Sequence, residues 1–148
     1  MAQYCQQTMP KIAIIAACSI LVLIIYLYYP RQLKTKKINI NSQEFTIEIA
    51  STPRQLTQGL SNRPQLCQNC GMLFVFPSPQ ILQFWMKDTL IPLDMIFIDQ
   101  DKKIVNVVTT PVGDLSIKNS TSPALYCLEL NAGTATKLNL KPGDILDF

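Results

Sequence analysis

The sequence predicts a mainly β domain, with α+β as the alternative, in which short strands form a small barrel or sandwich behind one transmembrane helix. Two observations predict this fold class. An uncharged apolar run fills residues 12–29, and many short apolar or alternating runs, bounded by turn residues, fill most of the rest. A chain of 148 residues holds one ordinary domain and is too short for two separate cores.

The apolar run divides the chain into four predicted segments. Its eighteen residues would span about 27 Å as a helix, close to the thickness of a bilayer's hydrocarbon core. Three tyrosines near its end suit the membrane interface. The predicted segments are an N-terminal tail at 1–11, a transmembrane anchor at 12–29, a basic juxtamembrane linker at 30–37 and a β-rich domain at 38–148.

The residues around the anchor leave its processing and orientation open. Ile15-Ala16-Ala17-Cys18 is similar to a lipoprotein cleavage box, although apolar residues follow where a polar mature start is expected. The positive-inside rule favours a cytoplasmic domain, because only Lys11 precedes the anchor while basic residues cluster after it. The same cluster can instead contact anionic headgroups on either side. Its members are Arg31, Lys34, Lys36 and Lys37.

The first part of the domain predicts a hairpin and a short helix. Apolar residues alternate with polar ones on both sides of the turn at 41–43, so residues 37–50 read as a β-hairpin with one buried face. Thr52-Pro53-Arg54-Gln55 has the pattern of a capping box with proline at the first helical position, and Gly59 ends the helix.

The remainder predicts several strands and one more short helix. Residues 72–76 are continuously apolar, which is typical of a strand buried on both faces, and Pro77-Ser78-Pro79 should end it. Residues 131–139 can hold a short helix, and a turn at 141–144 precedes the closing residues 145–146. Further strands are expected at 81–86, 95–98, 104–108 and 124–130.

Composition excludes several functions. The chain has no histidine, so it cannot use Ser-His-Asp or Cys-His catalysis and lacks the commonest transition-metal ligand. Apart from the basic cluster the charges nearly balance, which argues against a nucleic-acid partner. We therefore predict no cofactor and no metal, and expect as partners the membrane together with a small ligand or an envelope protein.

The densest group of chemically useful residues spans 84–94, at the end of an apolar strand. A strand end can line a pocket, with an aromatic wall and polar anchors. The alternative is that Trp85 is a core residue and that Lys87 and Asp88 form a solvated turn. The predicted ligand-binding residues are Arg63, Trp85, Lys87, Thr89, Asp94 and Glu129.

Eight motifs together resemble the prokaryotic family known as domain of unknown function 192, over about residues 38–148. The resemblance implies a compact, mostly β domain that often follows a signal sequence or membrane anchor, and it favours an extracytoplasmic location. It implies no established reaction. The motifs are QGLSNR (58–63), GMLFVF (71–76), FWMKDT (84–89), IPLD (91–94), FID (97–99), LEL (128–130), AG (132–133) and KPGD (141–144).

Three classes of function remain open from the sequence. In the first, the predicted residues line a cleft in which Trp85 stacks on a flat ligand while Lys87 and Arg63 favour an anionic group. In the second, Asp94 and Glu129 form a general acid and base. In the third, the domain is a scaffold that docks onto an envelope protein.

Cys67 and Cys70 have the spacing of a redox pair. A redox pair relies on a helix N-terminus to stabilise its thiolate, whereas a strand is predicted to follow here. Zinc would need four ligands, and the domain supplies only these two cysteines and Cys127 without histidine. A disulfide between Cys67 and Cys70, or two idle thiols, is the simpler interpretation, with Cys127 as a buried small apolar residue.

Overall fold

The structure, a computed structural model, describes residues 18–21 and 33–148. Residues 18–21 are helical, and the remainder of the predicted tail and anchor lies outside the described residues. Within the described part of the chain no helix has the length and hydrophobicity needed to cross a membrane. Residues 33–148 fall in one compact unit, so the account that follows concerns this unit by itself.

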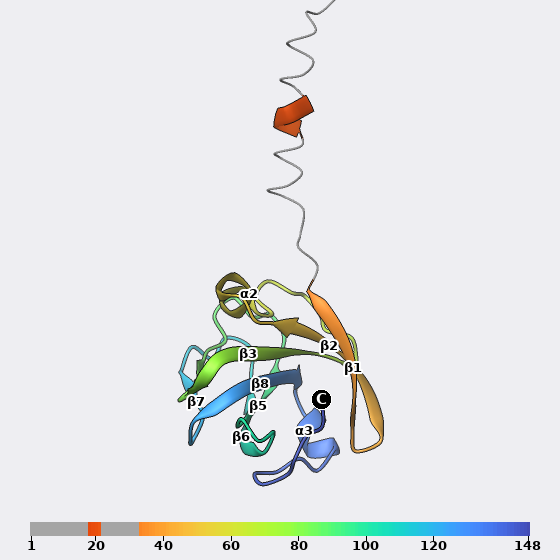
Figure 1. The fold of residues 1–148 in the computed structure, drawn as a ribbon, viewed down its shortest axis with the longest axis vertical. Helices are drawn as coiled ribbons and strands as arrows, with labels where there is room; N and C mark the ends of the chain where they lie inside the picture. Colours follow the sequence, from red (N-terminus) through yellow and green to blue (C-terminus); the bar gives the residue numbers. More distant parts are fainter. Residues whose placement is uncertain (1–17, 22–32) are drawn as a thin grey trace, which may run out of the picture. The chain divides into compact units, whose positions relative to one another are not determined.

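The unit is mainly β with few short helices, as predicted, and its strands form a mixed sheet (Figure 1). Six strands pair in the order β1-β2-β3-β8-β5-β6, and only the β2–β3 pair is parallel. The two edge strands, β1 and β6, do not pair with each other. The sheet strands are β1 (Lys34–Ile40), β2 (Gln43–Ala50), β3 (Cys70–Gln80), β5 (Leu93–Ile98), β6 (Ile104–Thr110) and β8 (Ala124–Asn131).

The predicted hairpin and capped helix are confirmed. β1 and β2 pair from Lys34↔Ile49 to Ile40↔Gln43, so the last four residues of the predicted linker belong to β1. The helix α2 (Pro53–Gln58) has the complete capping box, in which the Thr52 hydroxyl accepts from the Gln55 N–H and the Gln55 side chain accepts from the Thr52 N–H. This helix makes the parallel connection between β2 and β3 possible.

Two of the predicted strands differ most from the structure, and β5 begins two residues earlier than predicted, at Leu93. β3 runs through the proline-rich segment to Gln80, although its pairing with β8 is interrupted between Val75 and Gln80, where prolines cannot donate to a ladder. Of the strand expected at 81–86, only β4 (Gln83–Phe84) forms, paired with β7 (Lys118–Asn119) in a separate small sheet. After the predicted turn at 141–144, a single bridge joins Ile145 to Lys103.

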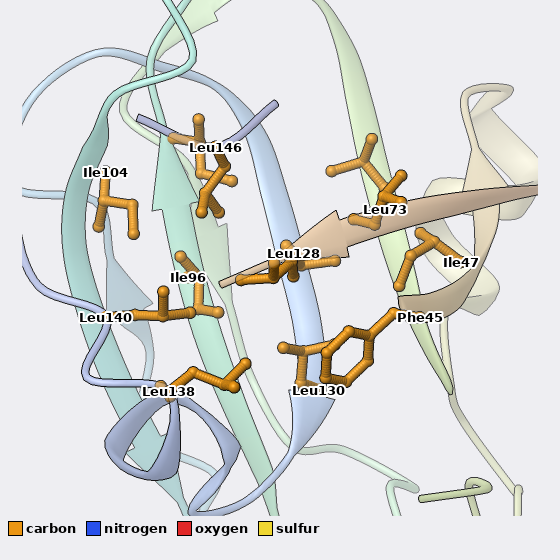
Figure 2. Packing of buried hydrophobic residues seen from close by; sticks show 14 residues of the cluster. Phe45, Ile47, Leu73, Ile96, Ile104, Leu128, Leu130, Leu138, Leu140 and Leu146 are labelled. Atoms are coloured by element: carbon orange, nitrogen blue, oxygen red, sulfur yellow. The ribbon is translucent and has the colours of Figure 1, made fainter. Parts of the chain in front are cut away.

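Both faces of the large sheet are covered. The face shown in Figure 2 packs against the short helix α3 (Thr134–Lys137) and the residues after it, through Leu138, Leu140 and Leu146. Segments that include Leu60 and residues 82–91 cover the opposite face. The interior strand β5, between β8 and β6, is therefore buried along its whole length, as a strand covered on both faces must be.

Candidate functional site

A cavity of about 350 Å³ opens on the face of the sheet that residues 82–91 cover. Its walls come from α2 and the turn after it, from two phenylalanines of β3, from residues 83–89, and from one residue of β8. This volume is at the lower end of the range of small-molecule sites. The lining residues are Leu56, Thr57, Gln58, Gly59, Leu60, Ser61, Phe74, Phe76, Gln83, Phe84, Trp85, Lys87, Thr89 and Glu129.

Glu129 is the lining residue that β8 supplies. It is only 4% exposed, and it pairs across the sheet with Met72 on one side and Met95 on the other. Within residues 33–148 its side chain has no hydrogen-bond or ion-pair partner. Every fully enclosed side-chain polar atom in the described chain has a partner, so the Glu129 oxygens must be reached from the cavity.

Burial changes the charge of this carboxyl group. Removal from water raises the pKa of Glu129 to about 8, because the ionised form loses its hydration and no cation compensates. Glu129 is therefore mainly protonated at neutral pH. In this form it offers one O–H donor and one carbonyl acceptor to the cavity that it lines.

Aromatic rings form the apolar walls. Phe84 meets Phe74 and Phe97 edge to face, with ring centroids 5.0 and 5.7 Å apart, and meets Phe76 at 6.1 Å. These contacts fix β4 against the sheet, and edge-to-face pairs favour one ring orientation. The cavity therefore combines rigid aromatic rings with polar side chains, among them Gln58, Gln83 and Glu129.

Trp85, Lys87 and Thr89 line the cavity together with Glu129. Trp85 is 56% exposed, so the alternative in which it is a core residue is wrong. The Lys87 ammonium lies 5.4 Å from the centre of the Trp85 ring, within the range of a cation–π contact. Thr89 is buried, and its hydroxyl donates to the Lys87 carbonyl at 3.4 Å. The structure thus brings together four of the six predicted residues.

Asp94 does not belong to this group. It pairs across the sheet with Leu130, so it points to the face opposite Glu129. Its carboxylate accepts from the Thr109 hydroxyl at 2.6 Å and from the Ala135 N–H at 2.7 Å, which ties β6 and the first turn of α3 to β5. The predicted acid–base pair of Asp94 and Glu129 is not assembled, because the sheet separates the two carboxyl groups.

Arg63 also lies outside the cavity. Its guanidinium donates to both carboxylate oxygens of Glu48 at 2.6 and 2.7 Å, in a partly buried bidentate pair. The hydrogen bond with Glu48 is the main cause of the raised pKa of Arg63. This arginine fastens the loop after α2 to β2 and leaves no free guanidinium for an anion.

Of the cysteines in residues 33–148, two form a disulfide and the third is buried. Cys67 and Cys70 form a disulfide at the start of β3, and the Asn131 side chain donates to the Cys67 carbonyl at 2.9 Å. Cys127 is fully buried, and burial, with a smaller contribution from the Glu129 charge, raises the pKa of its thiol well above the usual value. This thiol is therefore not poised as a nucleophile.

Sequence reasoning missed the three phenylalanines and the glutamines at 58 and 83 that complete the walls. In the structure exposed and buried side chains alternate from residue 81 to 86, with Leu82 and Met86 inward and Ile81 and Trp85 outward, but the sequence does not show this because residues on both faces are apolar. A period of two identifies the inward face, and it places Phe84 on that face.

Fold and cavity together define a class: a mixed-sheet β domain with a ligand-sized cavity built over a buried carboxyl group. The chain belongs to the domain of unknown function 192 family, described as "Uncharacterized ACR", which it matches over residues 35–148. This confirms the resemblance seen in the sequence. No curated protein matches the chain.

Two solved bacterial structures are similar to the chain. One, from Sinorhizobium meliloti and described as a "putative transcription regulator", is 35% identical with a TM-score of 0.74, over 80% of this chain and 96% of that one. The other, a protein of unknown function from Novosphingobium aromaticivorans, is 31% identical with a TM-score of 0.70, over 78% of this chain and 85% of that one.

Proposed function

We propose that the domain binds a small organic ligand in the cavity over Glu129. The observation that carries this proposal is a buried carboxyl group that has no partner in residues 33–148 and faces a cavity. A buried polar group without a hydrogen bond is costly, so such groups are rare in folded proteins. A ligand that supplies the missing hydrogen bonds offsets that cost.

The lining suggests the chemistry of the ligand. A protonated carboxyl group exchanges two hydrogen bonds with an amide or lactam edge, which has one donor and one acceptor side by side. Phe74, Phe76 and Phe84 suit a flat apolar body. The Lys87 ammonium, which also lines the cavity, favours a weakly anionic substituent on the ligand.

A thermal-shift screen with aromatic lactams, amides and their carboxylated analogues tests this proposal. A hit should bind Glu129→Gln within a few-fold of wild type, since glutamine keeps one donor and one acceptor. It should lose at least about tenfold in Glu129→Met, which offers neither. Asp94→Asn is the matched control, because it alters a buried carboxyl group on the other face. Equal binding by all three variants would refute the assigned site.

We further propose that residues 12–29 anchor the chain in a membrane and that the domain is extracytoplasmic. The apolar run supports the anchor, and the disulfide between Cys67 and Cys70 supports an oxidising compartment. Labelling of intact cells with an impermeant maleimide, before and after reduction, tests the location. Labelling of both cysteines only after reduction agrees with the proposal, whereas labelling only after lysis contradicts it.

The regulatory role in the description of the Sinorhizobium protein is not part of this proposal. Recognition of DNA depends on a basic face that neutralises phosphates. In residues 33–148 basic and acidic side chains nearly balance, and several of the basic ones are paired with carboxylates. A small-molecule ligand is therefore the better-supported partner of this domain.

A further inference from the structure

Six apolar side chains stand exposed on two loops beside the cavity. They are between 50% and 64% exposed, and they include the single tryptophan of the chain. Scattered exposed apolar residues are ordinary on protein surfaces, whereas a contiguous group marks an interaction site. This group, named here the apolar rim, consists of Ile81, Trp85, Leu90, Val112, Leu115 and Ile117.

The two loops are neighbours in space. Phe84 pairs with Lys118 in the small sheet, and the Met86 N–H donates to the Asp114 carbonyl at 3.4 Å. The Ser120 N–H also donates to the Leu82 carbonyl at 3.0 Å. Residues 82–86 and 114–120 therefore run side by side, so their outward side chains belong to one surface.

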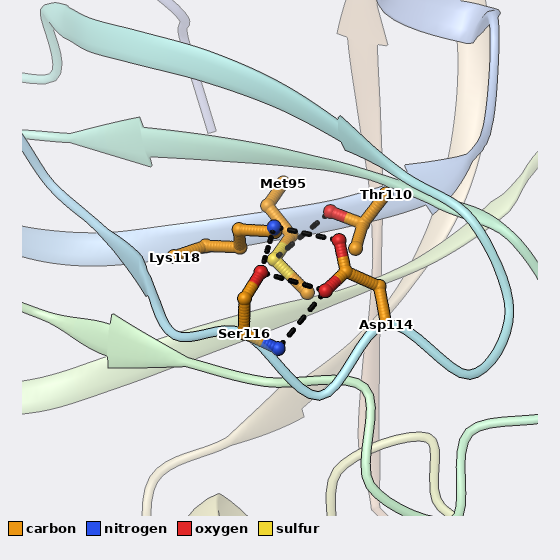
Figure 3. Close-up of polar contacts among 5 residues, drawn as sticks. All are labelled: Met95, Thr110, Asp114, Ser116 and Lys118. Atoms are coloured by element: carbon orange, nitrogen blue, oxygen red, sulfur yellow. Dashed lines mark hydrogen bonds and ion pairs between the residues drawn. The ribbon is translucent and has the colours of Figure 1, made fainter.

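Both loops are held so that the rim cannot turn inward. In the first loop the neighbours of the exposed residues, Leu82, Met86 and Ile91, are buried in the core. In the second, the Asp114 carboxylate accepts from the Ser116 hydroxyl at 2.6 Å and from the Lys118 ammonium at 2.7 Å (Figure 3). These bonds hold the pKa of Asp114 below its usual range, chiefly through Lys118.

We propose that the apolar rim is a membrane-docking surface that enters the headgroup region of the bilayer in which residues 12–29 are anchored. This inference rests on the anchor proposed above, and it is independent of the ligand. Residue 29 ends the apolar run and Leu33 begins the folded unit, so the connection spans at most about 14 Å. A domain tethered this closely must turn one face to the lipid.

The start of the domain indicates which face that is. Leu33 packs against the buried cluster on one face of the sheet, and the residues that support the first rim loop, Leu82, Met86 and Ile91, belong to the same cluster. The chain thus enters the domain on the side of the sheet that carries the rim. The composition of the rim suits the boundary between headgroups and acyl chains. It combines aliphatic residues with Trp85, and the Lys87 ammonium lies over the Trp85 ring.

Trp85 is the single tryptophan of the chain, so tryptophan fluorescence comes from one residue of the rim and makes a direct test possible. The full-length chain is reconstituted into phosphatidylcholine–phosphatidylglycerol vesicles with and without bromine on the acyl chains. Flotation reports the anchor, and quenching by bromine reports insertion of Trp85. We expect the chain to float, Trp85 emission to shift to the blue, and brominated lipid to quench most of it.

The variant Leu115→Ser/Ile117→Ser should still float but lose most of the quenching. Ile145→Ser, at a residue 72% exposed and outside the rim, is the matched control and should behave as wild type. If the chain floats but Trp85 emission is unquenched and resembles that in water, the membrane-docking role of the apolar rim is refuted, while the proposed anchor stands. A blue shift that grows with protein density without quenching would show contact between copies, and would also overturn the docking role. Failure to float would overturn both.

Discussion

Replacing Glu129 with glutamine should remove a pH dependence of stability that the wild-type domain shows between about pH 5 and 8. The pKa of Glu129 is about 8 in the folded domain against 4.5 for an ordinary glutamate. Between these values the unfolded chain loses the proton while the folded domain keeps it. The stabilisation by the proton is complete below pH 4.5 and is lost as the pH rises through 8, so wild-type stability falls with rising pH.

The size of the loss of stability follows from the raised pKa of Glu129. Each pH unit in this window costs the wild type about 1.4 kcal/mol, which amounts to about 3 kcal/mol at pH 7 and about 5 kcal/mol above pH 8. This is a large part of the 5–15 kcal/mol that is typical of a folded domain. No histidine titrates in this pH window, because the chain has none. The lowered pKa of Asp114 affects stability only at lower pH.

Urea denaturation of residues 33–148, followed by circular dichroism at pH 5, 6, 7 and 8, measures this dependence. We expect the free energy of unfolding of the wild type to fall across the series while that of Glu129→Gln stays nearly level. Ile145→Ser changes an exposed apolar residue and should keep the wild-type slope. Parallel profiles for wild type and Glu129→Gln would refute the assignment of Glu129 as a buried neutral acid.

Three further changes test the framework around the site, each by urea denaturation. Asp94→Asn should cost about 2 kcal/mol, because it weakens the capping of α3, and it should leave ligand binding unchanged. Gly71→Ala should cost about 3 kcal/mol, because its Cβ would lie 2.7 Å from a β8 carbonyl oxygen. Cys67→Ser/Cys70→Ser should cost about 2 kcal/mol, since the disulfide closes a short loop. Losses below about 0.5 kcal/mol would contradict each argument.

The elements that sequence reasoning predicted well are those specified by neighbouring residues. The β1–β2 hairpin follows from alternation around a turn, and α2 follows from its capping box. The order of the strands could not be predicted, because pairing between β3, β8 and β5 joins segments far apart in the chain. The continuation of β3 past Pro77 also depends on a distant partner, since Gln80 pairs again with Ala124.

The structure brings some of the predicted site residues together and separates others, and a shared segment does not decide which: Glu129 of β8 lines the cavity, whereas Asp94 from the 84–94 segment does not. Trp85, Lys87 and Thr89 lie within five residues and meet at the cavity, whereas Arg63 pairs with Glu48 instead. Nothing local reveals that pairing, because Glu48 is on another strand. The ligand-binding role of the four residues that do meet remains a prediction, which the thermal-shift screen tests.

Asp94 and Glu129 show why register decides function in a sheet covered on both faces. Each is a carboxyl residue within a run of apolar residues, so sequence alone treats them alike. Asp94 stands opposite Leu130, one residue from Glu129, and this single step sends the two side chains to opposite faces. On its face Asp94 accepts hydrogen bonds from two donors and holds β6 and α3 to β5. On the other face Glu129 contacts apolar side chains and lines a cavity. If the carboxyl group without a partner is the functional one, then Glu129 variants should alter binding while Asp94 variants alter only stability. A ligand that both residues affect equally would contradict this division.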